Sequence, residues 1–338
     1  METNFRQLAK KYSDLRVAVV GDFCLDRYLL IDPRKAEKSI ETGLPVHNVV
    51  SVRAQPGGAG TILNNLVALG AGAIYPVGFC GEDGEGFELK RALSQKGVRL
   101  DHFQSFANRR TFTYCKPLLV ESGREPRELS RLDSKNWTPT PPSLGREIAQ
   151  SVQALARTVD AMVVLDQVDI PGTGVVGTAV LRAVATAAKA RPGLLILADS
   201  RRGLKKFPPV CFKMNRAELS ALSGSRRRLS MRRVADEARA MALRNGRPVF
   251  VTLSEDGILG ATPDGEVARV SSIPTRGTID IVGAGDAVTA NLSMALAAGA
   301  SLETALAIAN AAASVVIHQL GTTGTASVGE IRRLLSRP

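Results

Sequence analysis

The chain has 338 residues, of which 44% are hydrophobic and 4% aromatic, a composition that suits a folded α/β protein and excludes a disordered chain. Its 44 basic and 32 acidic residues give a formal net charge of +12, which favours anionic partners such as phosphorylated metabolites, nucleotides or nucleic acid. The four cysteines and three histidines lie far apart without metal-ligand spacing. Neither a zinc site nor a disulfide framework is therefore indicated.

The first residues contain no apolar segment of the kind found in a signal peptide, and the longest apolar stretch, 305–317, is interrupted by Asn310 and Ser314. This stretch is too short to span a bilayer, so we expect a cytoplasmic protein with no membrane partner. The basic residues are spread along the chain and not interleaved with aromatics, so we expect no nucleic-acid partner. The densest basic cluster, Arg226 to Arg228, is typical of a solvated helix start, with a patch for an acidic partner or nucleic acid as the alternative.

Short, continuously apolar runs recur along the chain and indicate parallel strands that are buried on both faces. Helical patterns separate them, as in 230–245, which predicts a mostly parallel sheet with helices on both faces. A polar residue follows each of five such runs: Asp22, Asp166, Asp199, Asn215 and Thr252. Because the carboxyl ends of parallel strands meet at one edge of the sheet, we expect a ligand site at this edge.

Gly57 and Gly58 precede a helix predicted over 61–69, in which Asn65 lies off the apolar stripe. Adjacent glycines allow the backbone to approach a ligand closely. A second glycine-rich loop runs from Gly78 to Gly86. For this loop, a turn followed by a helix start is at least as good an interpretation as ligand contact.

Two segments, about 28–53 and 110–133, break the alternation of strand and helix. We expect them to form a small β lid, or flap, over the site, within a single domain of residues 1–338. Such a flap excludes water, which otherwise competes as a phosphoryl acceptor.

The stretch from Asp280 to Asp286 is where the sequence places the chemistry. Gly283, Ala284 and Gly285 form a tight turn that opens into a helix, and the amides at a helix start bind anions such as phosphate. Asp286 adds a carboxylate beside that anion site, which suits a general base that accepts the proton of an attacking hydroxyl. A packed helix start with an acidic residue is the plainer alternative.

Taken together, these segments resemble the ribokinase-like (PfkB) family of carbohydrate kinases over nearly the whole chain. The resemblance implies transfer of a phosphoryl group from ATP to a sugar, with Asp286 as the base, residues 283–285 as the anion hole, and a homodimer formed through the flap. It implies nucleotide contacts by Asn215, Glu218, Thr252, Ser254, Gly257 and Asn310, with Glu218 also placing Mg²⁺. It implies sugar contacts by Asp26, Gly57, Gly58 and Asn65.

Within the family, the segments Gly21 to Tyr28, Arg131 to Asp133 and Gln319 to Thr322 look most like the branch that phosphorylates D-glycero-D-manno-heptose 7-phosphate. Departures from that branch lie on the acceptor side: Thr61, Tyr114, Lys116, Gln167 to Asp169, and 34–41. They leave three alternatives open: the heptose phosphate, another hexose or pentose, or a kinase-derived binding protein without turnover. We expect this chain to lack the nucleotidyltransferase domain that is fused to some members.

Three cations are candidates to bind a phosphate on the acceptor itself, namely Lys116, Arg202 and Lys206. A phosphate monoester forms charge-assisted hydrogen bonds with such groups, whereas a neutral sugar gains little from them. Solvated surface cations are an equally good interpretation.

Overall fold

The computed structural model describes residues 2–225 and 227–336. Its main sheet has nine strands in the order β16-β15-β14-β13-β12-β11-β1-β6-β7. All neighbours are parallel except the pairs that β15 makes with β14 and β16. The strands are β1 (Arg16–Gly21), β6 (Ala73–Gly81), β7 (Phe103–Phe106), β11 (Ala161–Asp166), β12 (Leu195–Ser200), β13 (Cys211–Asn215), β14 (Val249–Thr252), β15 (Ile258–Ala261) and β16 (Val267–Val270).

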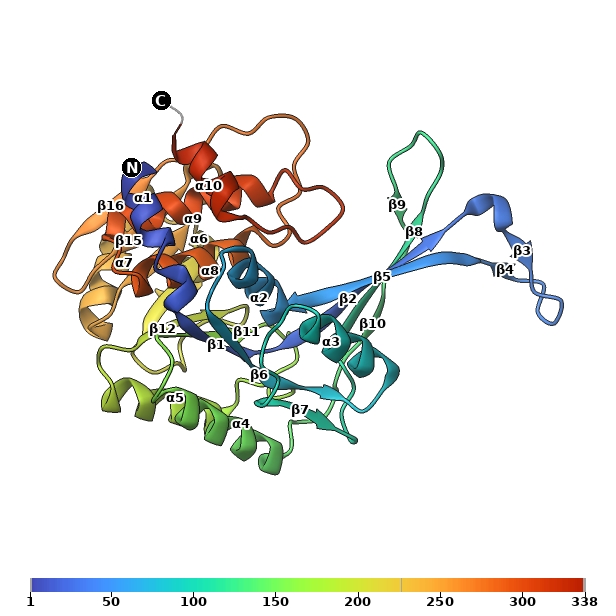
Figure 1. Ribbon diagram of the computed structural model, residues 1–338, viewed down its shortest axis with the longest axis horizontal. Helices are drawn as coiled ribbons and strands as arrows, with labels where there is room; N and C mark the ends of the chain where they lie inside the picture. The colour runs from blue at the N-terminus through green and yellow to red at the C-terminus, as the bar shows by residue number, and fades with distance from the viewer. Residues whose placement is uncertain (1, 226, 337–338) are drawn as a thin grey trace.

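Helices cover both faces of this sheet (Figure 1). Alternate residues of β1 belong to two different apolar cores, with Val17 and Val19 in one and Ala18 and Val20 in the other. The first core is covered by α1 (Glu2–Ala9), α2 (Ala59–Ala68), α3 (Gly84–Ser94), α8 (Ala284–Ala297), α9 (Leu302–Val316) and α10 (Val328–Leu335). The second is covered by α4 (Pro142–Leu155), α5 (Thr178–Ala190), α6 (Arg216–Leu222) and α7 (Met231–Asn245). Burial on both faces explains why the strands read as continuous apolar runs, and the predicted fold class is confirmed.

A second sheet of five strands projects from the body as the flap (Figure 1). It consists of β2 (Phe23–Ile31), β5 (Val49–Gly58), β8 (Thr113–Leu119), β9 (Arg127–Glu128) and β10 (Leu132–Ser134). At its tip, β3 (Glu37–Lys38) pairs with β4 (Pro45–Val46). Short 3-10 helices complete the structure: η1 (Tyr12–Asp14), η2 (Pro33–Lys35) and η3 (Ser254–Asp256). The flap strands begin nearer the body than predicted, because β2 already starts at Phe23 and β5 continues to Gly58.

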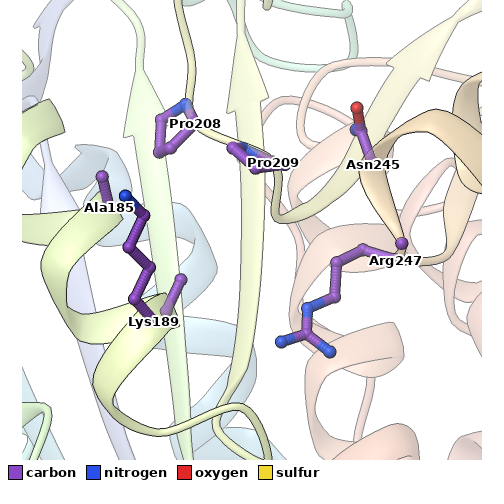
Figure 2. Close-up of a pocket in the computed structure, with 8 residues that line it drawn as sticks. Ala185, Lys189, Pro208, Pro209, Asn245 and Arg247 are labelled. Carbon is purple, nitrogen blue, oxygen red and sulfur yellow. The ribbon is translucent and has the colours of Figure 1, made fainter.

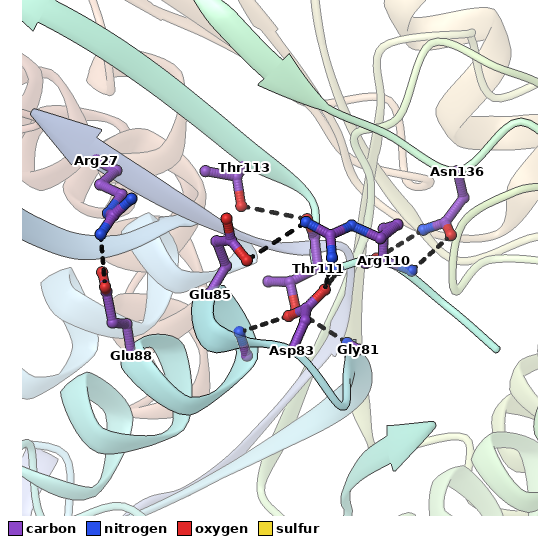
Figure 3. Close-up of polar contacts among 10 residues, drawn as sticks. Arg27, Gly81, Asp83, Glu85, Glu88, Arg110, Thr111, Thr113 and Asn136 are labelled. Carbon is purple, nitrogen blue, oxygen red and sulfur yellow. Dashed lines mark hydrogen bonds and ion pairs between the residues drawn. The ribbon is translucent and has the colours of Figure 1, made fainter. Parts of the chain in front are cut away.

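Hydrogen bonds fix the base of the flap to the start of α3 (Figure 3). Asp83 caps α3 and also accepts bonds from the backbone N–H of Thr111, at 3.0 Å, and from its hydroxyl, at 2.6 Å. The amide of Asn136 bonds to both the N–H and the carbonyl of Arg110, at 2.9 and 2.8 Å. The glycine-rich loop from Gly78 to Gly86 is thus the end of a strand and a capped helix start, in agreement with the turn interpretation, and it anchors the flap.

Within the part of the chain that the structure describes, no helix is both long enough and apolar enough to cross a membrane.

Candidate active site

The predicted anion site lies at the start of α8, at the carboxyl edge of the main sheet. Gly283 is the N-cap and has a φ of 84°, a left-handed conformation that favours glycine, and the helix begins at Ala284. The N–H of Ala287 makes the first regular helical bond, to the carbonyl of Gly283 at 2.9 Å. The amides of Gly285 and Asp286 precede it in the first turn, where a helix supplies no acceptor. Within the described residues these two amides have no hydrogen-bond acceptor, so they are available to an anion.

Asp286 is a half-buried carboxylate in this first turn. Burial raises its pKa to about 7, the charge of Lys213 opposes the shift, and the charge of Asp199 adds to it. A carboxyl group with this pKa accepts and releases a proton near neutral pH, as a general base requires.

A buried ion pair lies beneath the anion site. The ammonium of Lys213 on β13 donates to Oδ2 of Asp199 on β12 at 2.8 Å, and the hydroxyl of Thr289 donates to the same oxygen at 3.3 Å. A Cβ on Gly285 would lie 3.1 Å from Nζ of Lys213, so glycine there lets the cation approach the helix start. Burial lowers the pKa of Lys213, but the charge and the hydrogen bond of Asp199 outweigh it and raise the pKa. Lys213 therefore stays charged under the anion site.

The predicted acceptor side is built around Asp26 on β2. Its side chain is buried, and Oδ2 accepts a hydrogen bond from the hydroxyl of Thr323 at 3.1 Å. A Cβ on Gly57 would lie 2.7 Å from the same oxygen, so the close approach that this glycine allows is that of Asp26. Burial raises the pKa of Asp26, whereas the charge of Lys116 and the Thr323 bond lower it.

One face of the flap carries polar and cationic side chains towards this carboxylate. The strand register places Tyr28 opposite both Arg53 and Lys116. The guanidinium of Arg53 lies 4.2 Å from the centre of the Tyr28 ring, and Nζ of Lys116 lies 5.1 Å from it. Because residues two apart on a strand share a face, Asp26 and Tyr28 do so. Lys116 is thus placed beside the acceptor carboxylate.

Gly58 and Asn65 support the acceptor side from beneath. Gly58 has a φ of 56°, and a Cβ there would lie 2.5 Å from the carbonyl oxygen of Asp22. Asn65 is fully buried; its Nδ2 donates to the carbonyls of Thr61 and Gly324 at 3.0 and 3.4 Å, and its Oδ1 accepts from the N–H of Ala326 at 3.2 Å. These bonds occupy the amide, so Asn65 holds the loop at 324–326.

Asp22 fixes the loop that borders the acceptor side. Its fully buried carboxylate accepts bonds from the backbone N–H groups of Gln167, Val168 and Val175, at 2.8, 3.1 and 2.6 Å. Burial raises its pKa to about 6, and these bonds oppose the shift. Asp22 follows a strand, as predicted, but its carboxylate serves the chain's own backbone and not a ligand.

Asn215 and Glu218 begin α6 as a reciprocal capping box. Oδ1 of Asn215 accepts from the N–H of Glu218 at 2.9 Å, and Oε2 of Glu218 accepts from the N–H of Asn215 at 2.7 Å. Burial raises the pKa of Glu218, while the charges of Lys213 and Arg201 lower it. Within residues 2–225 and 227–336, Oε1 of Glu218 has no hydrogen-bond donor, and it remains available to a metal ion.

The predicted nucleotide residues fall into two groups. Asn215, Thr252 and Ser254 line a cavity of about 680 Å³. Glu218, Gly257 and Asn310 do not line it. Gly257 has a φ of 89°, and Nδ2 of Asn310 donates to the carbonyl of Ser271 at 2.8 Å. The same cavity is also bordered by Arg216, Ala217, Ser220, Ala221, Ser225, Arg227, Arg228, Leu253 and Glu255, whereas Arg226 lies outside the described residues.

A smaller cavity of about 290 Å³ lies apart from this site (Figure 2). Pro208, Pro209, Asn245 and Arg247 border it and precede β13 and β14, and Lys189 of α5 completes one side. It therefore lies at the amino-terminal edge of the sheet, opposite the edge that carries Asp286.

Two of the three candidate cations for an acceptor phosphate, Arg202 and Lys206, follow β12. The guanidinium of Arg202 donates to Oδ1 of Asp166 at 2.7 Å, and the hydroxyl of Ser200 donates to Oδ2 at 2.8 Å. Arg202 is thus engaged by a strand-end carboxylate. Lys206 is exposed. The charge of the preceding residue, Arg201, instead acts on the two carboxylates of the anion side, Asp286 and Glu218, as one of the influences that lower their pKa values.

A carboxylate beside the first-turn amides of a helix suits phosphoryl transfer to an alcohol, the reaction of small-molecule kinases. Residues 15–328 match the model of the pfkB family of carbohydrate kinases. The chain belongs to this family.

Two relatives show how far the likeness extends along the chain. The bifunctional protein HldE of Azorhizobium caulinodans is 32% identical over 326 residues, and that of Azotobacter vinelandii is 33% identical over 335 residues. In both cases the alignment covers 95% of this chain and 64% of the relative. The chain therefore spans less than two-thirds of the length of these relatives.

Solved structures share the fold at lower sequence identity. Arabidopsis thaliana ribokinase, complexed with ribose and ATP, superposes with a TM-score of 0.68 at 21% identity. Escherichia coli phosphofructokinase-2, in complex with substrates and products, superposes with a TM-score of 0.71 at 20% identity. Each comparison covers 96% of this chain and 99% of the other, so the fold is shared from end to end.

Proposed function

We propose that this chain transfers the γ-phosphoryl group of ATP to a hydroxyl of a sugar phosphate, with a heptose 7-phosphate as the acceptor. The observation that carries the proposal is the juxtaposition of Asp286 with the free amides of α8 and the buried cation of Lys213. A proton acceptor, an anion site and a fixed positive charge then meet at one point of the sheet edge, which is what a kinase needs in order to position and stabilise a transferring phosphoryl group.

In the proposed mechanism, Asp286 accepts the proton of the acceptor hydroxyl while the oxygen of that hydroxyl forms a bond to the γ-phosphorus. The bond from that phosphorus to the bridging oxygen breaks, and the electron pair leaves with ADP. The amides of Gly285 and Asp286 and the charge of Lys213 stabilise the negative charge on the transferring group. The flap, which carries Asp26 and Lys116, keeps water from the acceptor.

The residues present fit a Mg²⁺ ion that is shared with the phosphates. Within the described residues, no group of three or more His, Cys, Asp or Glu side chains can hold a metal ion by itself. Protein-bound Mg²⁺ commonly has one or two carboxylate ligands and takes the rest from phosphates and water, and we propose that Oε1 of Glu218 would be one of these ligands. Bound Mg²⁺ would neutralise charge on the phosphates.

Glu218→Gln is therefore expected to raise the Mg²⁺ concentration needed for half-maximal activity. Glutamine still caps α6, because its side-chain oxygen accepts from the N–H of Asn215, so the helix start is preserved. The measurement is a Mg²⁺ titration of initial rate at saturating sugar and ATP. A variant curve that overlays the wild-type curve, or activity without divalent metal, would remove Glu218 from the metal site.

Support for a phosphorylated acceptor comes from the flap face that carries Arg53 and Lys116 beside Asp26. The second support is the match to the relatives named HldE. The segments Gly21 to Tyr28 and Gln319 to Thr322, which resemble the heptose branch, agree with it. A neutral hexose or pentose remains the alternative acceptor, and it would gain little from these cations.

A phosphorylated sugar should therefore be preferred strongly over its unphosphorylated parent in kcat/KM. Lys116→Ala should remove much of that preference while barely changing the rate with the neutral sugar, since only the phosphate forms a charge-assisted bond. The assay compares a heptose 7-phosphate and hexose phosphates with their parents at equal concentration, with Lys10→Ala on the body as the control. Equal or faster turnover of the neutral sugar would contradict the proposal, and binding without ADP release would favour a binding protein.

We also propose that two chains associate through their flaps. Val50 and Val52 of β5 are each 47% exposed, and the two-residue period of a strand puts them on the face opposite Arg53. Apolar side chains exposed in a row on a projecting sheet are typical of an interface.

Val52→Asp should accordingly convert a dimer into a monomer, because it would bury a charge in that interface. The control is Leu243→Asp, which changes a side chain that is 70% exposed on α7, away from the flap. The molar mass in solution is measured by light scattering across a concentration series. A monomeric wild type would show that there is no dimer. Dissociation of both variants alike would show that the effect is not specific to the flap, and the interface would then lie elsewhere.

A further inference from the structure

The loop that follows α9 connects the acceptor side with the anion site through one residue, Thr323. Its side chain is buried, and its hydroxyl donates to Oδ2 of Asp26 at 3.1 Å across a sequence separation of 297 residues. Thr323 bonds only to Oδ2, so the other carboxylate oxygen of Asp26, Oδ1, takes no part in this bond. The bond also favours the charged form of the carboxylate, which is the form that accepts bonds from hydroxyl groups.

The other branch of the same side chain packs against the anion site. A Cβ on Gly283 would lie 2.7 Å from the methyl carbon of Thr323 and 3.5 Å from that of Thr61. Thr323 therefore fills the space between the acceptor carboxylate and the N-cap of α8. Its hydroxyl contacts Asp26 on the acceptor side, and its methyl group contacts Gly283 at the anion site.

Neighbouring bonds hold the loop in place, so Thr323 is not free to turn away. The guanidinium of Arg53 donates to the carbonyl of Gly321 at 2.7 Å, and the hydroxyl of Thr322 donates to Oε1 of Gln55 at 3.2 Å. On the far side of Thr323, the amide of Asn65 bonds to the carbonyl of Gly324 and the N–H of Ala326. The loop is thus fixed to β5 before Thr323 and to α2 after it.

We propose that Thr323 is a positioning residue for the acceptor: it sets the orientation of the Asp26 carboxylate, and its packing sets the separation between that carboxylate and the anion site. This inference rests on the proposed function, since it assigns the geometry of the same acceptor site. A hydroxyl must lie in line with the phosphoryl group to attack it, and small displacements of a reacting group reduce the rate strongly. A residue that contacts both sides controls that alignment.

The test compares Thr323→Val, which keeps the shape and removes the hydroxyl, with Thr323→Ser, which keeps the hydroxyl. The valine variant should raise the KM for the acceptor by about 10-fold to 100-fold, as expected for loss of a hydrogen bond to a charged group, while the KM for ATP stays unchanged. The serine variant should keep the acceptor KM near the wild-type value but lower kcat, because its methyl group no longer packs on Gly283. Thr186→Val, which removes an exposed hydroxyl on α5 away from the site, should change neither constant.

Direct binding of the heptose 7-phosphate by calorimetry gives a second measurement that does not depend on turnover. Thr323→Val should weaken the Kd by the same factor as the KM, and Thr323→Ser should not. Wild-type acceptor affinity in the valine variant overturns the inference, as does an equal loss of ATP and acceptor affinity in a variant whose melting temperature is unchanged. If the wild type neither binds nor phosphorylates any sugar of the panel, the proposed function itself fails, and this inference fails with it.

Discussion

Asp286→Asn is expected to lower kcat by about 10² to 10⁴, the range typical for loss of a general base. Asparagine matches the carboxylate in size and hydrogen bonding but does not accept the proton of the hydroxyl. The amides of α8 belong to the backbone and persist in the variant, so the affinity for ATP should change little. Steady-state rates with saturating sugar and ATP measure the loss, and Asp236→Asn on the exposed side of α7 serves as the control.

The pH dependence gives an independent measure of the same group. Because burial raises the pKa of Asp286 to about 7, the base is protonated and inactive below that pH. The wild-type kcat/KM should rise with pH and level off above about 7. The residual activity of the asparagine variant should lack this acid limb. A variant with near-normal kcat, or one whose acid limb persists unchanged, would exclude Asp286 as the base.

Lys213→Met is expected to reduce both stability and activity. The change leaves Asp199 charged, buried and without its cation, and removing one partner of a buried ion pair costs about 3 to 5 kcal/mol. The loss of the cation beneath the anion site should also lower kcat/KM. Without the opposing charge of Lys213, the pKa of Asp286 should rise further, so the acid limb should move to higher pH.

The double variant Lys213→Met with Asp199→Leu separates these two effects. Replacing both members of a buried pair by apolar groups is often neutral or stabilising, so the free energy of unfolding should recover in large part. Activity should not recover, because the charge under the phosphoryl group is still missing. Denaturant unfolding and kcat/KM are measured on the same samples. Recovery of both would show that the pair is structural only.

The sheet, the flap and the anion turn were predictable because each depends on local sequence. Burial on both faces produces runs such as Val17 to Val20, and the turn at Gly283 needs a residue that tolerates a positive φ. Asp286 follows that turn directly along the chain. The strand-end rule located the edge of the sheet correctly, but the side chains of all five of its residues, Asp22, Asp166, Asp199, Asn215 and Thr252, bond to the chain itself.

Other parts of the site depend on contacts that sequence periodicity does not contain. Lys213 lies within an otherwise apolar strand, and its role is visible only once Asp199 and Gly285 are seen beside it. The family resemblance implies a sugar contact for Asn65, whereas in the structure its amide bonds to the chain. The loop at 324–326 covers it from 259 and 261 residues away. The sequence does not distinguish the adjacent Arg201 and Arg202, and only the structure shows that it is Arg202 that bonds to Asp166.

The buried carboxylate of Asp22 also has a consequence for the order in which the chain folds. Its bonds join residues that are 145 to 153 positions apart, and the bond from Thr323 to Asp26 spans 297 positions. Contacts between distant residues require closure of large loops, and they form later and more slowly than helices and hairpins. The bonds of Asp22 span about as much of the chain as the pairing of β1 with β11, so we expect them to form with the main sheet, and we expect the much longer loop closed by Thr323 and Asp26 to form later.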